Sequence, residues 1–357
     1  MKSSAFDYAY PPELVAQHPL PERGASRMLV LSRKTGAIAH RTFREFPTLL
    51  RPGDVLVRNV SKVIPARLIG TRDNGRDAEI LLVHSETDGT WLAMVHPGGK
   101  LKAGRTVRFG DDASAEVVGV VGGGLRRLRF HGLPVVEIMD RYGTTPLPPY
   151  IARPAEPADR KLYQTVYARD DGSVAAPTAG LHFTEETLSA VQAAGVTIAD
   201  VTLHVGPGTF KPVEVDSPHE HVMHGEWYQL PRATLDAIQR SRQEGARVWA
   251  VGTTAARTLE TIASSVTSEP LSHADEAADD QRTRDSETLS GWTDLFIYPP
   301  YEFRVVDGLL TNFHLPRSTL IMLVAAFAGH DATMRAYREA VTQRYRLFSY
   351  GDAMVID

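Results

Sequence analysis

Three histidines stand in loops built from small residues, where an imidazole could transfer a proton. His182 follows Thr178 and Gly180, and His204 and His314 occupy comparable loops further along the chain. Imidazole donates or accepts a proton near neutral pH, and small residues let a backbone approach a ligand closely. We therefore take His182, His204 and His314 as the candidate catalytic residues.

The loop after His204 contains residues that allow backbone amides to approach a ligand. Gly206, Gly208 and Thr209 follow the histidine, and Pro212 comes soon after them. A dinucleotide fingerprint requires a helix directly after such glycines, and the proline disfavours one. The sequence therefore argues against a nicotinamide-binding fold, while a tight turn without a ligand explains these residues equally well.

The start of a predicted helix is the most specific of these loops. A buried strand leads into Gly252, Thr253 and Thr254, and the following helix carries Arg257. Threonine can cap a helix, while its hydroxyl and the free amides face a ligand carboxylate or sugar hydroxyl. Capping alone explains one threonine, so we predict ligand contact here.

A fourth loop lies between a strand and an apolar helix near the C-terminus. It carries Asn312 and His314, with Ser318 as the expected N-cap of the helix. Tyr350 and Asp352 stand in a later turn and could form a wall of the same pocket. Open α/β sheets bind ligands where their strands end, which favours a shared site. A loop histidine satisfied by its own hydrogen bonds is the plainer alternative.

A histidine-rich stretch contains residues that could bind a metal ion. His219, His221 and His224 are close in sequence, and Glu226 could complete a ligand set. Pro218 precedes them, and no helix would place the three rings on one face. We therefore predict no metal, and expect packing and hydrogen bonding around a substrate pocket instead.

The elements that must position these loops indicate an α/β fold with an inserted all-β, barrel-like domain. Residues 64–150 form short β runs separated by glycine and aspartate, which is typical of a small barrel. Helices and strands alternate after a proline-rich connector at 144–154. We assign residues 1–63 and 151–357 to the α/β domain.

Composition excludes several classes of protein. The 357 residues contain 43% hydrophobic and 23% charged residues and no cysteine, so disulfides, thiolate zinc sites and cysteine nucleophiles are excluded. The N-terminus lacks a signal-peptide pattern, and the apolar run at 319–329 is about half the length that spans a bilayer. We expect a cytoplasmic protein without a membrane partner.

The net charge of the chain does not indicate whether the protein binds nucleic acid. Residues 264–287 hold seven acidic residues and two arginines, which accounts for more than the whole net charge of −4. This segment lacks periodicity and large apolar residues, so we predict an acidic, solvated loop.

The segments, taken in order, resemble the S-adenosylmethionine:tRNA ribosyltransferase-isomerase family of the queuosine pathway. The similarity covers nearly the whole chain except 264–287. It rests on these stretches: FDYAYPPELVAQHPLPERGASRMLVL, GDVLVRN, VIPARL, PLPPYI, YQTVYA, GSVAAPTAGLHFT, VTLHVGPGTFKPV, HVMHGEWY, AVGTTAARTLE, WTDLFIYPPYEF, LLTNFHLPRSTLIMLV and YRLFSYGDAM.

The resemblance implies the same fold and a defined reaction. The ribosyl part of S-adenosylmethionine would move to 7-aminomethyl-7-deazaguanine at the wobble position of a tRNA. Isomerisation would give epoxyqueuosine, with release of adenine and methionine. S-adenosylmethionine is then a substrate, tRNA is the partner, and neither a metal nor a further cofactor is implied.

That chemistry suggests roles for the candidate residues. The sulfonium should favour an aromatic face such as Phe183, Phe210 or Tyr301. Arg257 and the start of its helix could hold the methionine carboxylate. The full set of predicted substrate-binding residues is Thr178, Gly180, Phe183, Gly206, Gly208, Thr209, Phe210, Thr253, Thr254, Arg257, Tyr301, Asn312, Tyr350 and Asp352.

Two groups of basic residues could contact tRNA phosphates, although a solvated face explains each group equally well. The predicted tRNA-binding residues are Lys100, Lys102, Arg105, Arg126, Arg127 and Arg129 in the β-rich part, and Arg335 and Arg338 in the last helix, to which we add Arg344 and Arg346.

Where the family usually has Asn, then Asp or Asn, then Thr and Arg, this chain has Asn59, Val60, Ser61 and Lys62, and it also departs from the family at Ala255, Pro300 and Gly24. A lost carboxylate and hydroxyl leave room for a paralogue of altered specificity. A non-catalytic tRNA- or nucleotide-binding protein is the second alternative. The sequence does not decide the oligomeric state, with a monomer slightly favoured.

Overall fold

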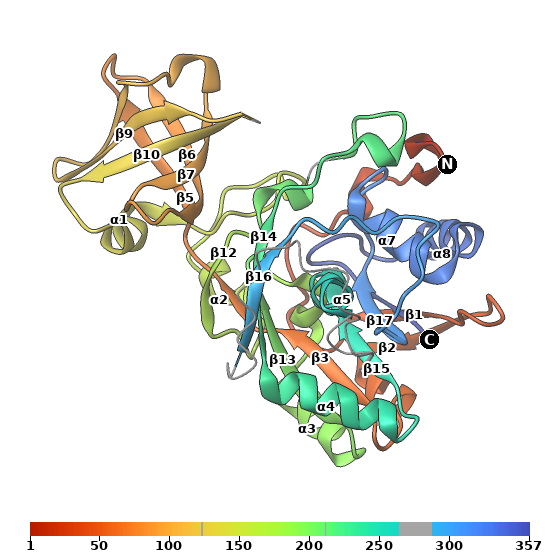
Figure 1. Ribbon diagram of the computed structural model, residues 1–357. Helices are drawn as coiled ribbons and strands as arrows, with labels where there is room; N and C mark the ends of the chain where they lie inside the picture. The colour runs from red at the N-terminus through yellow and green to blue at the C-terminus, as the bar shows by residue number, and fades with distance from the viewer. Residues whose placement is uncertain (123, 211, 264–287) are drawn as a thin grey trace, which may run out of the picture.

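The computed structural model describes residues 1–122, 124–210, 212–263 and 288–357, with the side chain of Phe210 also left out. A large α/β domain carries a small β-barrel at one end (Figure 1). This confirms the predicted fold class. The acidic segment 264–287 lies outside the described residues, so the prediction of a solvated loop there stays a prediction.

A mixed sheet forms the centre of the α/β domain. Within the described residues it has nine strands in the order β16-β14-β13-β3-β15-β17-β18-β1-β2, of which β13, β3, β15 and β17 are mutually parallel. The strands are β1 Arg27–Leu31, β2 Ile38–Thr42, β3 Val55–Asn59, β13 Thr197–Leu203, β14 Glu226–Pro231, β15 Val248–Val251, β16 Thr288–Thr293, β17 Gly308–Asn312 and β18 Ala353–Ile356.

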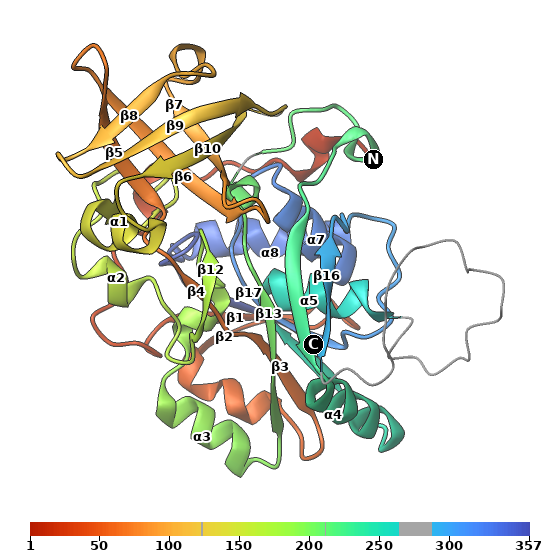
Figure 2. The ribbon, with the colours of Figure 1, turned by 60° about the vertical axis from the view of Figure 1, so that its left-hand side comes forward.

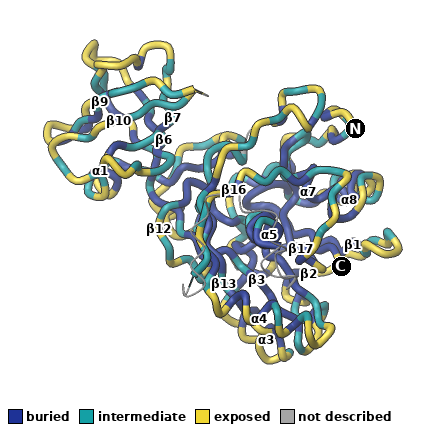
Figure 3. The backbone as a smooth tube through the Cα atoms, viewed as in Figure 1, coloured by how far each residue is buried: buried dark blue, intermediate teal, exposed yellow. Residues whose placement is uncertain are grey.

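Helices cover both faces of this sheet. Among the described residues, the helices of this domain are α2 Asp159–Leu162, α3 Glu185–Ala193, α4 Arg232–Gln243, α5 Gly252–Thr261, α7 Thr319–Ala328 and α8 His330–Thr342. Alternate strand residues serve the two faces, as strand geometry requires. Val55 and Val57 belong to the same buried cluster as residues of α4, α5, α7 and α8, whereas Leu56 belongs to a cluster with residues of α3 and the 3-10 helix Phe43–Leu49. Figure 3 shows the buried residues concentrated in this layered centre.

The apolar segment near the C-terminus forms the buried helix α7, as predicted. Ser318 is its N-cap, because its hydroxyl accepts a hydrogen bond from the amide of Ile321 at 3.3 Å. No helix in the described ranges has the length and apolar character that crossing a membrane would require.

The inserted domain is a closed barrel. In the described part of the chain its strands are β5 Arg67–Arg72, β6 Asp77–Ser85, β7 Trp91–His96, β8 Thr106–Phe109, β9 Ala113–Val120 and β10 Leu125–His131, with β5 pairing β8 to close the ring. Gly70 permits this closure, since a Cβ there would lie 2.5 Å from the carbonyl oxygen of Arg108. Helix α1 Val135–Tyr142 covers one end, and β11 Gly143–Thr144 returns alongside β5.

A two-stranded parallel ladder lies between the domains. It consists of β4 Ser61–Val63, which leads into the barrel, and β12 Asp170–Ser173, which follows the proline-rich connector. Figure 2 shows this ladder beneath the barrel, next to the end of β13. The barrel therefore stands over the carboxyl ends of the parallel strands, where α/β sheets bind ligands.

Candidate substrate pocket

A pocket lies at the carboxyl ends of strands β13, β15 and β17. Its outline takes in about 620 Å³ of space not filled by protein atoms, open solvent included, and its walls come mainly from residues 175–179, 252–254 and 311–315. Small side chains dominate the first two segments, which leaves backbone close to the cavity. We call this cavity the substrate pocket.

The structure brings together six of the predicted site residues from four separate segments. They are Thr178, Thr209, Thr253, Thr254, Asn312 and His314, all lining the substrate pocket. The carboxyl ends of parallel strands meet at one sheet edge, which accounts for the convergence of these residues except Thr178, which follows β12 of the two-stranded ladder. Their individual roles stay predictions.

The start of helix α5 presents unpaired polar groups to the substrate pocket. Gly252 has φ +86°, so a left-handed residue turns the chain from β15 into the helix. No described side chain caps this helix start. The hydroxyl of Thr254 is buried and has no hydrogen-bond partner among the described residues. Free amides and a free hydroxyl make this helix start suited to an anionic group.

Asn312 links the substrate pocket to His182. Its Nδ2 donates to the carbonyl oxygen of Phe348 and to Nε2 of His182, each at 3.2 Å. The carbonyl only accepts, so it fixes the amide orientation and makes Nε2 of His182 an acceptor. Nδ1 of His182 then donates to the hydroxyl of Ser26 at 2.8 Å. Oδ1 of Asn312 is buried without a partner in the described ranges.

The two buried histidines are neutral at pH 7. Burial, with added repulsion from Arg23 and Arg346, lowers the pKa of His182 to about 3. Burial lowers the pKa of His314 to about 3 as well, and its Nε2 lies 2.7 Å from the hydroxyl of Thr311. The expectation of a near-neutral pKa is not met at either ring, so both imidazoles are weak bases.

His204 is separated from the other two histidines. Its neighbour Val205 lines the substrate pocket, whereas His204 and Gly206 line a second cavity between the α/β domain and the barrel. Alternation along an extended chain accounts for this, because successive side chains point to opposite sides. We call the second cavity the aromatic pocket.

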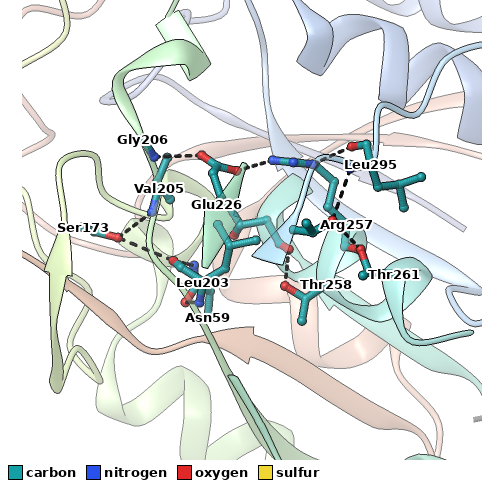
Figure 4. A network of polar contacts seen from close by, with 12 residues as sticks. Asn59, Ser173, Leu203, Val205, Gly206, Glu226, Arg257, Thr258, Thr261 and Leu295 are labelled. Carbon is teal, nitrogen blue, oxygen red and sulfur yellow. Dashed lines mark hydrogen bonds and ion pairs between the residues drawn. The ribbon is translucent and has the colours of Figure 1, made fainter. Parts of the chain in front are cut away.

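A buried ion pair joins β14 to α5, and its carboxylate reaches the chain segment that carries Val205 and Gly206 (Figure 4). The guanidinium of Arg257 pairs with the carboxylate of Glu226 through Nη1, and its Nε donates to the carbonyl oxygen of Leu295 at 3.0 Å. Glu226 also accepts the amide of Gly206 at 2.8 Å. Arg257 does not line the substrate pocket, so the predicted contact with a ligand carboxylate is not seen there.

A comparison over nearly the whole chain identifies the family to which it belongs. A family model described as queuosine biosynthesis protein matches residues 3–356. This chain belongs to the queuosine biosynthesis family. Curated relatives named S-adenosylmethionine:tRNA ribosyltransferase-isomerase are 52% identical in Thermotoga maritima and 51% identical in Symbiobacterium thermophilum, each over 100% of both chains.

A solved structure shows the same fold. The crystal structure of the S-adenosylmethionine tRNA ribosyltransferase from Thermotoga maritima has a TM-score of 0.54 with this queuosine-family chain. The structural alignment has 43% sequence identity and covers 99% of this chain and 100% of the other.

Two predicted aromatic contacts are not in the substrate pocket of this queuosine-family protein. Phe183 is fully buried against Phe43 and Phe46, and the hydroxyl of Tyr301 donates to Glu260 at 3.3 Å. The side chain of the third candidate, Phe210, lies outside the described residues. Aromatic residues that the sequence analysis missed do line the pocket, namely Tyr150, Phe313 and Phe348.

Gly180 and Gly208 serve close packing against protein side chains. A Cβ on Gly180 would lie 2.2 Å from the hydroxyl of Tyr167, and one on Gly208 would lie 3.1 Å from the ring of His224. Gly180 lies within the 3-10 helix Thr178–His182, so His182 precedes the start of α3 rather than standing in it.

The predicted wall at Tyr350 and Asp352 faces away from the substrate pocket. Tyr350 lines a smaller adjoining cavity with His182, and its hydroxyl donates to Asp159 at 3.0 Å. Asp352 is buried and accepts the amides of Arg27 and Arg346 at 2.9 and 2.8 Å. Burial raises the pKa of Asp352, although these amides oppose the effect. These contacts give Asp352 a structural role.

The basic residues of the barrel divide into exposed and engaged groups. Arg126 donates to the carbonyl oxygens of Leu101 and Gly98, both at 2.7 Å, and Arg127 pairs with Glu86. The exposed members are Lys100, Lys102, Arg105 and Arg129. The exposed residues match a phosphate-binding role better than the engaged ones.

Only two of the four arginines in the second basic group lie on the last helix. Arg335 and Arg338 lie exposed on α8, and Arg335 donates to the carbonyl oxygen of Gly36 at 2.6 Å. Arg344 and Arg346 follow the helix, which ends at Thr342, so placing them on the last helix was wrong.

The histidine-rich stretch shows no metal site. The described ranges contain no group of three or more His, Asp or Glu side chains arranged to hold a metal ion. His221 packs against the ring of Phe296, and His219 bonds the hydroxyl of Ser217 at 2.5 Å. Within this stretch, Glu226 has a clear structural role, because it forms the buried ion pair with Arg257.

Most of the departures from the family pattern are buried, whereas Pro300 is exposed and the side chain of Lys62 is 44% exposed. Asn59, which keeps the family residue, donates to the carbonyl oxygen of Leu203 at 2.9 Å and accepts its amide at 3.0 Å. Ser61 bonds the hydroxyl of Ser173 at 2.8 Å, and Ala255 is fully buried in the core. These residues hold the ends of β3, β13 and α5 in place.

Proposed function

We propose that the protein is an S-adenosylmethionine:tRNA ribosyltransferase-isomerase. It transfers the ribosyl part of S-adenosylmethionine to 7-aminomethyl-7-deazaguanine at the wobble position of a tRNA. The ribosyl group isomerises to give epoxyqueuosine, and adenine and methionine leave. The reaction takes place in the cytoplasm without a metal or further cofactor. Full-length similarity to relatives of that name supports the assignment.

One structural observation carries the location of the site. The hydroxyl of Thr254 and Oδ1 of Asn312 are buried without partners among the described residues, and both residues line the substrate pocket. A buried polar group without a partner costs about 1–3 kcal/mol, so a polar ligand that pairs with both would be stabilised. We assign the methionine carboxylate to the amides and hydroxyl at the start of α5.

The remaining walls suit a sulfonium nucleoside. Tyr150 and Phe348, with ring centroids 4.9 Å apart, offer aromatic faces that attract a sulfonium cation. His314 presents a neutral imidazole, the form that can accept a proton. Oδ1 of Asn312 can accept a hydrogen bond from an amine. We assign His314 to proton transfer and Asn312 to orienting the attacking amine.

Adenine release tests the proposed reaction. Purified protein is incubated with S-adenosylmethionine and a tRNA that carries the aminomethyl-deazaguanine, and free adenine is measured over time. Matched reactions contain the same tRNA with guanine at the wobble position. We expect adenine only with the modified tRNA. Its absence there would favour a paralogue of altered specificity or a non-catalytic tRNA-binding protein.

A matched pair of threonine variants tests the location. Thr254→Val removes the pocket hydroxyl, and we expect the KM for S-adenosylmethionine to rise about 10-fold, as for a lost hydrogen bond to a charged group. Thr258→Val is the control, because its hydroxyl bonds the carbonyl oxygen of Thr254 at 3.0 Å within the same helix. Equal kinetics for both variants would contradict the placement.

A further inference from the structure

Three aromatic rings form a row across neighbouring strands on the barrel-facing side of the sheet. Trp227 of β14 pairs directly with Trp292 of β16. His204, just past the end of β13, donates its amide to the carbonyl oxygen of Trp227 at 2.9 Å. Its ring stacks on Trp227 with centroids 5.2 Å apart and planes 20° apart. We call these three residues the aromatic ladder.

The aromatic ladder forms one wall of the aromatic pocket, and the barrel forms the other. His84 of β6 and Trp91 of β7 come from the barrel, and the ring of His84 lies 5.3 Å from that of Trp292. Three of the four tryptophans in the sequence therefore gather at one cavity. Trp292 is 57% exposed, so much of its ring lies open to solvent.

The aromatic ladder also offers a free hydrogen-bonding atom beside its flat ring faces. Nδ1 of His204 is buried and has no partner within the described part of the chain. Burial lowers the pKa of His204, partly opposed by Asp170 and Asp171, so the ring is neutral at pH 7. Its position depends on Gly172, since a Cβ there would lie 2.7 Å from the imidazole.

The chemistry of this cavity matches an unpaired nucleobase. A base offers two flat faces for stacking on indole and imidazole rings and polar atoms at its edge. The half-exposed Lys62 lies beside the cavity, paired at 3.1 Å with the lining residue Asp171. Such exposed pairs are weak, so a phosphate can compete for the cation.

The aromatic pocket also lies next to the substrate pocket. The two cavities share one wall, in which Val205 faces the substrate pocket while His204 and Gly206 face the aromatic pocket. An RNA loop that delivers one base to the substrate pocket therefore passes within reach of the ladder.

We propose that the aromatic ladder of His204, Trp227 and Trp292 is a stacking site for an unpaired nucleobase of the RNA substrate, separate from the base that reacts. The proposal rests on the proposed function, which supplies a tRNA as the substrate. Stacking contributes about 1–3 kcal/mol per base in other proteins, which sets the expected effect.

Tryptophan emission measures the contact independently of activity. The full-length protein is titrated with an RNA hairpin that carries an anticodon loop, and with a fully paired duplex of the same stem. We expect the hairpin to quench emission and the duplex to have little effect. Trp292→Ala should weaken hairpin binding about 10-fold, measured by anisotropy of a labelled hairpin, whereas Trp292→Phe should keep most of the affinity.

Ile69→Ala is the matched control, since Ile69 is a 59% exposed apolar residue on the barrel that does not line the aromatic pocket. It should bind the hairpin as the wild type does. The inference is overturned if Trp292→Ala and Ile69→Ala bind the hairpin equally, or if Trp292→Ala weakens the duplex as much as the hairpin.

The adenine assay separates this inference from the proposed function. Trp292→Ala should raise the KM for the modified tRNA and leave kcat unchanged. Normal adenine release by the wild type, with an unchanged KM and unchanged hairpin affinity in Trp292→Ala, overturns the stacking site alone. A wild type that binds the hairpin through Trp292 but releases no adenine overturns the reaction and leaves the stacking site standing.

Discussion

The substrate pocket and the aromatic pocket lie on opposite sides of one short chain segment and differ in almost every property. The substrate pocket is built mainly from small residues, buried polar groups and the aromatic rings of Tyr150, Phe313 and Phe348, and its histidine is buried. The aromatic pocket joins two domains and is lined by half-exposed rings. Buried polar groups suit the chemistry of a small substrate, whereas open rings suit the recognition of a large one.

The largest effect is expected from breaking the Arg257–Glu226 ion pair. Glu226 holds the amide of Gly206, which lies in the chain segment that separates the two pockets. Arg257→Met leaves the Glu226 carboxylate buried without its cation. We expect the free energy of unfolding, measured by urea denaturation, to fall by about 3–5 kcal/mol.

The double variant Arg257→Met with Glu226→Gln removes both charges and keeps an acceptor for the Gly206 amide. It should recover most of the lost stability, because the cost comes from an unpaired buried charge. A single variant that unfolds within about 1 kcal/mol of the wild type would show that the pair does not support the wall.

The histidines of the two regions should differ in their response to acid. His182 and His314 have folded-state pKa values of about 3 against 6.5 for an unperturbed histidine. The unfolded chain therefore binds more protons between these values, and stability falls as the pH drops below 6.5. At pH 5 each ring should cost about 2 kcal/mol of unfolding free energy relative to pH 7.5.

Unfolding at pH 7.5 and pH 5 checks this in variants that cannot titrate. His314→Gln should lose about 2 kcal/mol less than the wild type between the two pH values. His204→Gln should resemble the wild type more closely, because His204 is only partly buried. Identical pH dependence of His314→Gln and the wild type would contradict the burial argument.

The smallest expected effect concerns the side from which RNA approaches. If RNA reaches both pockets past the barrel, replacing Lys100, Lys102 and Arg105 together by alanine should weaken hairpin binding about 10-fold, or about 1.4 kcal/mol. It should also reduce the dependence of affinity on salt. Arg335→Ala with Arg338→Ala should have less effect, because α8 lies at the far end from the barrel (Figure 1). The reverse order would place the RNA on α8.

Strand periodicity and loop composition were enough to predict the fold class and much of the substrate pocket. Thr254 and Asn312 lie at the carboxyl ends of the neighbouring parallel strands β15 and β17, so sheet topology alone brings them to one edge. Thr178 instead follows β12 of the two-stranded ladder. The inserted barrel was equally visible, because its short strands and turn residues contrast with the helical periodicity that follows.

The remaining features of the site could not be predicted as well, because they depend on the direction in which each side chain points. Val201 and Leu203 of β13 are buried against the helices, and continuing their alternation would have placed Val205, rather than His204, toward the substrate pocket. That signal was present in the sequence. No local pattern pairs Arg257 with Glu226, which lies 31 residues earlier, because the contact arises only when β14 packs against α5.

The chain enters and leaves the barrel at one place. Arg67 and Thr144 are paired directly across antiparallel strands, so their Cα atoms are about 5 Å apart. A tight turn could replace everything between them without stretching either flank. We therefore expect that the barrel can be excised and that the α/β domain still folds without it.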